Sequence, residues 1–143
     1  VCFKLADEEY AFDITRVQEV IRLQPITEVP QMPDFVLGVV NIRGSVVPVF
    51  DLRKKFHLPE KKADDHTKIL VVSVDNELIS FIVDEILDNL KLDSEQLDPA
   101  PAIKMSLEKE CVQGDGLVDD RMISVLDISY VNKGINAAIE ASI

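Results

Sequence analysis

The feature that most constrains the fold is a pair of short apolar runs joined through a glycine. FVLGVV (residues 35–40) is followed, after NIRG, by VVPVFD (residues 46–51), and both runs are rich in β-branched residues. Glycine as the first residue of a two-residue loop supplies the positive φ of a type II′ turn, so Gly44 and Ser45 predict a β-hairpin. Arg43 then stands beside the turn, where its guanidinium is either a contact point or a solvated side chain.

Most of the remaining chain also predicts short strands. The runs KILVVSV and LISFIVD are almost continuously aliphatic, which favours strands buried on both faces. A short helix capped by Asp51 and a C-terminal helix over residues 127–143 complete the pattern. The segment TRVQEVIRL fits a helix and a twisted strand about equally. The other expected strands cover residues 2–5, 10–14, 68–74, 78–84, 111–118 and 122–126.

An internal similarity appears when the chain is displaced by 76 residues. FVLG then falls on CVQG (residues 111–114), and VVPVFDL falls on MISVLDI (residues 122–128). The match is either a chance similarity between hairpins or a duplication. A unit of roughly 70 residues is marginal on its own, so a duplication predicts two small barrels packed on a shared core.

The polar segment PEKKADDH (residues 59–66) is the best candidate for a loop between two halves. We therefore expect a first barrel over about residues 1–60 and a second over about residues 67–130. The C-terminal helix over residues 127–143 follows. The fold class predicted is mainly β, with two five-stranded barrels and few helices.

Charge limits the partners that this chain can have. The 143 residues include 15 Lys and Arg against 26 Asp and Glu, a net charge of −11. Such a surface repels phosphate backbones and anionic lipid, so binding to nucleic acid or a membrane surface is disfavoured. No apolar run approaches the roughly 18 residues of a membrane span, and no signal peptide opens the chain. Val1 in place of Met suggests that the natural N-terminus is missing.

Catalytic and metal-binding patterns are absent from the sequence. Cys2 and Cys111 lie far apart without CxxC spacing, which is typical of reduced thiols in the cytosol. No zinc motif, phosphate loop or nucleophile elbow occurs, so we expect no metal, no cofactor and no enzyme activity. The alternative is a small acidic hydrolase that uses turn carboxylates, such as the pair Asp119 and Asp120.

One acidic residue stands out because it lies among apolar residues that are expected to pack. In VQEV, Glu19 is either an exposed acid on an amphipathic element or the partner of a nearby cation. A pair between Glu19 and Arg43 would orient both side chains beside an apolar-rimmed groove. Its value would be specificity more than affinity, because burying charges against a partner costs desolvation.

The hairpin sequence NIRGSVVPVFDLR resembles the signature hairpin of the CheW-like coupling domains of bacterial chemotaxis. Three further stretches match in the expected order: EYAFDITRVQEV, ITEVPQMPDFVLGVV and GDGLVDDRMISVLDI. The resemblance covers roughly residues 1–130. It implies two five-stranded barrels of the Src-homology-3 type and a non-enzymatic adaptor that couples chemoreceptors (methyl-accepting chemotaxis proteins) to the histidine kinase CheA.

The resemblance also implies partners and contact residues. In the family, the cytoplasmic signalling tip of the receptor docks in a groove between the subdomains, and the regulatory domain of CheA binds end to end within a larger array at the inner membrane. The receptor-binding candidates carried over by motif are Val17, Glu19, Gly38, Ile42, Arg43 and Gly44. The kinase-binding candidates, which no short motif places and which core strands explain equally, are Ile69, Val71, Ile79, Phe81 and Val83.

Three homologous contexts fit the resemblance. A free-standing cytoplasmic adaptor is favoured because the chain ends in a plausible terminal helix. The coupling half of a CheV-type protein and the regulatory domain of a CheA kinase are the alternatives.

Overall fold

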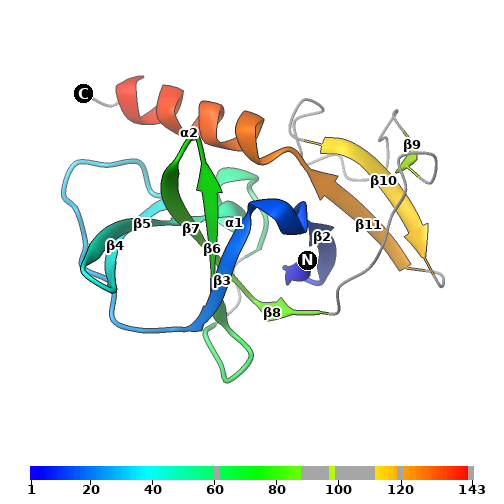
Figure 1. The fold of residues 1–143 in the computed structure, drawn as a ribbon, viewed down its shortest axis with the longest axis horizontal. Coiled ribbons are helices and arrows are strands. Elements are labelled where there is room, and N and C mark those ends of the chain that lie inside the picture. The colour runs from blue at the N-terminus through cyan, green and yellow to red at the C-terminus, as the bar shows by residue number, and fades with distance from the viewer. Residues whose placement is uncertain (60–61, 88–96, 99–111, 119–120, 142–143) are drawn as a thin grey trace.

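The computed structural model describes residues 1–59, 62–87, 97–98, 112–118 and 121–141. They form mainly strands (Figure 1). The strands are β1 (Cys2–Leu5), β2 (Glu8–Ala11), β3 (Val17–Arg22), β4 (Val36–Ile42), β5 (Ser45–Asp51), β6 (Lys68–Val74), β7 (Glu77–Val83), β8 (Glu85–Ile86), β9 (Leu97–Asp98), β10 (Val112–Val118) and β11 (Arg121–Leu126). The helices are η1 (Ile14–Arg16, one 3-10 turn), α1 (Leu52–Lys55) and α2 (Ile128–Ala141). The predicted mainly β fold class is confirmed, and the ambiguous segment TRVQEVIRL contains a strand.

The first sheet has five strands in the order β3-β6-β7-β5-β4. Neighbouring strands pair antiparallel, except β5 and β7, which run parallel. The interior strand β6 is buried on both faces: Ile69 and Val71 enter one apolar cluster, and Leu70 and Val72 enter another. This confirms the inference drawn from its continuous aliphatic sequence.

The second sheet joins the two ends of the chain. Its order is β8-β1-β2-β11-β10-β9, with β2 and β11 parallel. The predicted division into barrels over residues 1–60 and 67–130 is therefore wrong, because the N-terminal hairpin pairs with the C-terminal one. The polar segment at residues 59–66 falls between α1 and β6 in the chain, and both β5 and β6 belong to the first sheet. This polar segment therefore connects elements of one sheet and is not a boundary between two halves.

The internal similarity corresponds to a structural repeat. The β4–β5 ladder shifts register between Val36 and Gly38, and the β10–β11 ladder shifts at the positions 76 residues later, between Val112 and Gly114. The second strand of each hairpin also pairs in parallel with the second strand of another hairpin, β5 with β7 and β11 with β2. A shared bulge and a shared parallel neighbour favour duplication over chance similarity.

The largest apolar cluster lies between the two sheets and draws on both. Phe12, just after β2, lies with its ring centroid 5.0 Å from Phe3 and 5.4 Å from Phe81. Helix α2 covers this region (Figure 1), and its residues Val131 and Ile135 are buried in the same cluster. Burying each such side chain contributes about 1.5–3 kcal/mol of transfer free energy, so the shared core stabilises both halves.

Candidate functional site

The β4–β5 hairpin closes through Arg43 and Gly44, because Ile42 pairs directly with Ser45. The φ angle is 51° at Arg43 and 86° at Gly44, which is the pattern of a type I′ turn. The predicted type II′ turn at Gly44 and Ser45 was therefore wrong by one residue. Glycine fits the first loop position of a type II′ turn and the second loop position of a type I′ turn. A residue with a Cβ at the first position costs roughly 1–2 kcal/mol, so Arg43 stands where local preference would not put it.

Strand β3 brings an acidic residue to this turn. Its alternation places Glu19 on the less exposed face, between Val17 and Ile21. Arg43 Nη2 donates a hydrogen bond to Oε2 of Glu19 at 2.6 Å. The predicted pairing of these two residues is confirmed.

The exposure of the pair decides what it can do. The Arg43 side chain is 81% exposed and the Glu19 side chain 23%. An ion pair in such a solvated setting stabilises a fold by only about 0.2–1 kcal/mol. The arrangement therefore orients a guanidinium toward solvent more than it holds the fold together.

The entry into β3 is fixed by a local cap. Asp13 Oδ1 accepts hydrogen bonds from the backbone N–H of Thr15 at 2.9 Å and from its hydroxyl at 2.8 Å. These bonds favour the charged carboxylate and lower the pKa of Asp13 below its ordinary value. The cap begins the short helix η1, which connects the N-terminal hairpin to β3.

An open hollow of about 460 Å³ runs beside the ion pair. Its wall combines Glu19 and Arg43 with the apolar side chains of Ile21, Leu23 and Ile42. A second hollow of about 370 Å³ adjoins it along β4 and shares Gln24 and Asn41 with the first; Val39, Val40 and Val46 add to its wall. An apolar floor with one ion pair at its rim suits a partner that presents an apolar face.

Gly38 has a structural reason to be glycine. Its φ is 147°, and a Cβ built on it would lie 2.0 Å from the carbonyl oxygen of Thr27. Thr27 and Val39 exchange two backbone hydrogen bonds, of 2.9 and 2.8 Å, so the segment before β4 crosses directly over this residue. Gly38 is buried, and its absent side chain permits the crossing.

The other receptor-binding candidates differ in exposure. Ile42 is buried in the cluster inside the first sheet, and Val17 is half-buried against the larger cluster. Gly44 is exposed at the tip of the hairpin. The structure thus gathers Glu19, Ile42 and Arg43 on one hollow.

Comparison with known proteins identifies the family. Residues 1–133 match the family described as CheW-like domain. The chain is a member of the CheW-like family.

Individual relatives agree with this assignment. The Chemotaxis protein CheW of Klebsiella aerogenes is 37% identical over 126 residues, which cover 88% of this chain and 76% of that protein. The Chemotaxis protein CheW of Helicobacter pylori is 33% identical over 131 residues, with coverage of 92% and 79%. The crystal structure of the scaffolding protein TtCheW from Thermoanaerobacter tengcongensis matches with a TM-score of 0.85 at 30% identity, covering 92% of this chain and 84% of that one.

The kinase-binding candidates of this CheW-like domain lie in its interior. All of them are buried, from 0% to 6% exposed: Ile69, Val71, Ile79, Phe81 and Val83. The prediction that they form a contact surface is wrong, because both faces of the β6–β7 hairpin are covered by neighbouring apolar clusters.

The structure contains a buried ion network that the sequence did not predict. The Arg53 guanidinium contacts the carboxylate of Asp51 at 3.0 Å and that of Asp84 at 2.7 Å, and Arg53 is 7% exposed. Asp84 also accepts a hydrogen bond from the backbone N–H of Ala6 at 2.8 Å. The network joins α1, the end of β7 and the β1–β2 turn, so it fixes one sheet against the other. DLRKK suggested only a capped helix, since nothing local points to Asp84.

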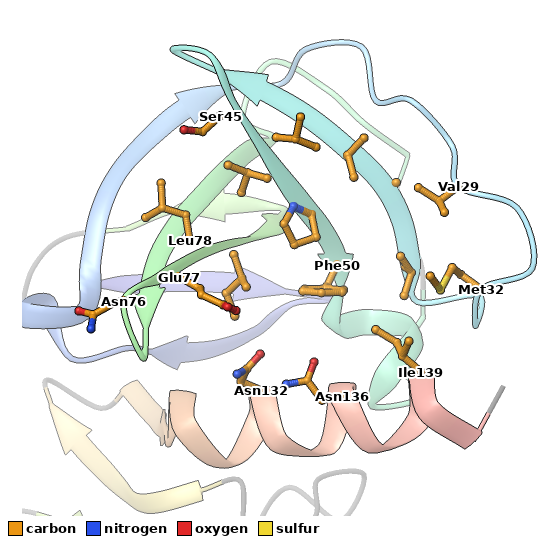
Figure 2. A pocket seen from close by; sticks show the side chains of 17 residues that line it. Val29, Met32, Ser45, Phe50, Asn76, Glu77, Leu78, Asn132, Asn136 and Ile139 are labelled. Atoms are coloured by element: carbon orange, nitrogen blue, oxygen red, sulfur yellow. The ribbon is translucent and has the colours of Figure 1, made fainter. Parts of the chain in front are cut away.

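A further hollow, of about 640 Å³, lies between the first sheet and α2 (Figure 2). Asn132 and Asn136 point into it from the helix, facing Phe50 and Glu77, while Met32 and Ile139 lie at one end. Asn132 and Asn136 lie four residues apart, and so on one side of α2; they were not singled out from the sequence.

Several described carboxylates accept hydrogen bonds or form ion pairs. Glu9 pairs with Arg121 at 2.7 Å, and Glu8 accepts a 2.6 Å hydrogen bond from the hydroxyl of Tyr10. Asp119 and Asp120, the pair proposed for a hydrolase, lie outside the described residues, as does Cys111. Among the residues described, no three His, Cys, Asp or Glu side chains group as a metal site. Within the same ranges no helix is long and apolar enough to cross a membrane.

Proposed function

We propose that this CheW-like domain is a non-enzymatic coupling adaptor of bacterial chemotaxis, which binds the signalling tip of a chemoreceptor and the histidine kinase CheA. The observation that carries the proposal is the Glu19–Arg43 ion pair, whose residues come from VQEV and NIRG, within two of the stretches that resemble the family. The relatives reported above are chemotaxis proteins, and the solved one is a scaffolding protein. The domain would then act in the cytoplasm, at receptor arrays on the inner membrane.

The receptor surface that we propose is the hollow beside the ion pair. An amphipathic helix can lay its apolar side on Ile21, Leu23 and Ile42, as helices do in apolar grooves. Arg43 and Glu19 stand at the rim, where charged groups fix orientation and register. Of the motif candidates, Val17 and Gly38 do not line this hollow: Val17 packs against the larger apolar cluster, and Gly38 permits the backbone crossing by Thr27.

The CheA partner rests on family membership alone. The buried residues of the β6–β7 hairpin are removed from this part of the proposal. A CheV-type protein or a CheA regulatory domain is the alternative context that the motifs allow. The relatives reported above are CheW proteins, which favours the adaptor.

The use of several described acidic residues supports the adaptor over the hydrolase. Asp13 caps the turn before β3, and Glu9 pairs with Arg121. Both histidines, His57 and His66, are exposed. A general base has to lie within hydrogen-bond reach of a nucleophile, and neither histidine is placed in the hollow.

The test is a titration of the domain against two ligands, a receptor signalling-tip fragment and a CheA regulatory domain. Arg43→Ala is expected to weaken receptor binding about tenfold, by removing a charge-assisted contact, while leaving CheA binding unchanged. The free energy of unfolding of Arg43→Ala should differ from that of the parent by less than about 1 kcal/mol, because the ion pair is solvated.

Arg16→Ala is the matched control, since Arg16 is an exposed arginine in η1 outside the hollow. It should bind both ligands as the parent does. Equal receptor binding by Arg43→Ala and the parent would reject the hollow as the receptor site. A parent that binds neither ligand would reject the adaptor itself.

A further inference from the structure

Asn41 makes a hydrogen bond that no role assigned so far uses. It is exposed near the end of β4, directly across the hairpin from Val46. Its side-chain Oδ1 accepts a hydrogen bond from the backbone N–H of Gly44 at 2.9 Å. This hydrogen bond therefore links a side chain of strand β4 to the backbone of the loop.

The amide of Gly44 is not used by the hydrogen bond that closes the turn. The hydrogen bond that closes a β-turn uses the amide of its fourth residue, here Ser45. The Gly44 amide belongs to the peptide unit that links Arg43 to Gly44. Because a peptide unit is planar, a bond to this N–H restrains ψ of Arg43 and φ of Gly44 together.

Arg43 needs such a restraint. Its φ of 51° lies in the left-handed region, which Asn, Asp and Gly favour at this turn position. A residue persists in that region only where its surroundings determine it. The described residues offer two determinants: the Gly44 amide bond from Asn41 and the guanidinium bond to Glu19.

Another turn of this chain has a similar hydrogen bond, made to the amide of the first loop residue and not the second. The β1–β2 loop has positive φ at Ala6 and Asp7, and Ala6 is likewise an unfavoured residue there. Its amide is held by the carboxylate of Asp84 at 2.8 Å. In both turns, a side chain outside the loop accepts from a loop amide.

We propose that Asn41 is a positioning residue: it holds Arg43 in the left-handed backbone conformation from which the guanidinium reaches Glu19 and faces the partner. The part of this proposal that concerns binding rests on the proposed receptor contact. The part that concerns the turn stands on the hairpin alone. Asn41 also lines the proposed receptor hollow, so the experiment has to separate a direct contact of Asn41 with the partner from its effect on Arg43.

The turn is tested first, in the absence of any partner. Amide hydrogen exchange of Gly44 should be faster in Asn41→Ala than in the parent, and the Arg43 side-chain NMR signals should shift toward those of a free arginine. Asn41→Asp keeps an acceptor oxygen at the same position and should restore both signals. Gln18→Ala, which removes an exposed side chain from the opposite face of β3, should change neither. Unchanged Gly44 exchange in Asn41→Ala would overturn the proposal.

Binding to the receptor-tip fragment is the second measurement. Asn41→Ala should weaken it about fivefold, the effect of one lost hydrogen bond, and Asn41→Asp should restore it. In an Arg43→Ala background, Asn41→Ala should add less than about twofold, because coupled residues are not additive. An equal loss in both backgrounds would show that Asn41 acts independently of Arg43 and would reject positioning. If the parent does not bind the fragment, the receptor assignment fails, while the exchange and NMR results still decide the role of Asn41 in the turn.

Discussion

Replacing Gly38 by alanine tests whether the fold requires glycine at this position or whether the residue serves contact with a partner. The backbone at this residue has φ of 147°, where a side chain costs about 1–3 kcal/mol. The new Cβ would lie 2.0 Å from the Thr27 carbonyl oxygen, so the crossing segment has to move away. Its two hydrogen bonds with Val39, of 2.9 and 2.8 Å, are then lost, at about 1 kcal/mol each.

These contributions sum to a loss of about 3–5 kcal/mol in the free energy of unfolding. For a domain of this size, each kcal/mol lowers the melting temperature by about 2–4 °C, so Gly38→Ala should melt about 10 °C below the parent. Urea denaturation gives the free energy directly, from the midpoint and slope. Receptor binding by the fraction that remains folded should stay close to that of the parent.

Two other glycines are matched controls. A Cβ on Gly44 or on Gly134 would meet nothing within 4 Å, but Gly44 has φ of 86°. Gly44→Ala should therefore lose only the conformational cost, about 1 kcal/mol. Gly134→Ala, inside helix α2, should stabilise the domain by about 0.5–1 kcal/mol. If Gly38→Ala unfolds within 1 kcal/mol of Gly44→Ala, the crossing is not what requires glycine, and the proposed reason is refuted.

Two further perturbations test the interior and the entry to β3. Arg53→Met leaves the carboxylates of Asp51 and Asp84 buried without their cation, so unfolding in urea should become easier by about 3–5 kcal/mol; a change below about 1 kcal/mol would mean that the network does not join the sheets. The pKa of Asp13 is lowered in the folded state by the Thr15 amide, so its carboxylate stabilises the fold above its unfolded pKa, and this contribution disappears as pH falls through the folded pKa. Asp13→Asn should therefore lose less stability than the parent between neutral and acid pH, and an NMR titration of Asp13 with an ordinary midpoint would contradict the cap.

Several features of the site follow from sequence alone because they are local. The β4–β5 hairpin, the capped helix α1 and the C-terminal helix depend on alternation, turn residues and capping residues within a few positions of one another. The sequence also suggested that Glu19 and Arg43 could pair, and the structure contains that ion pair. The repeat at 76 residues also matched equivalent bulges in the two hairpins, which favours duplication.

Other local signals were ambiguous by their nature. Gly44 satisfies two turn types that differ by one residue in register, and only the pairing of Ile42 with Ser45 selects between them. The motif VLGVV marked Gly38 as important, but the reason is a backbone crossing by Thr27, which no spacing within the motif reveals.

Tertiary structure alone decided which distant segments meet. The N-terminal hairpin pairs with β11 rather than with its neighbours in the chain, because a parallel pair joins residues more than a hundred positions apart. The same holds for Arg53, whose second carboxylate comes from Asp84 on another element. An aliphatic strand such as β6 has the same sequence whether it faces a partner or two layers of core. Its burial is set by what packs on each face, and the sequence of the strand carries only the hydrophobicity that either arrangement requires.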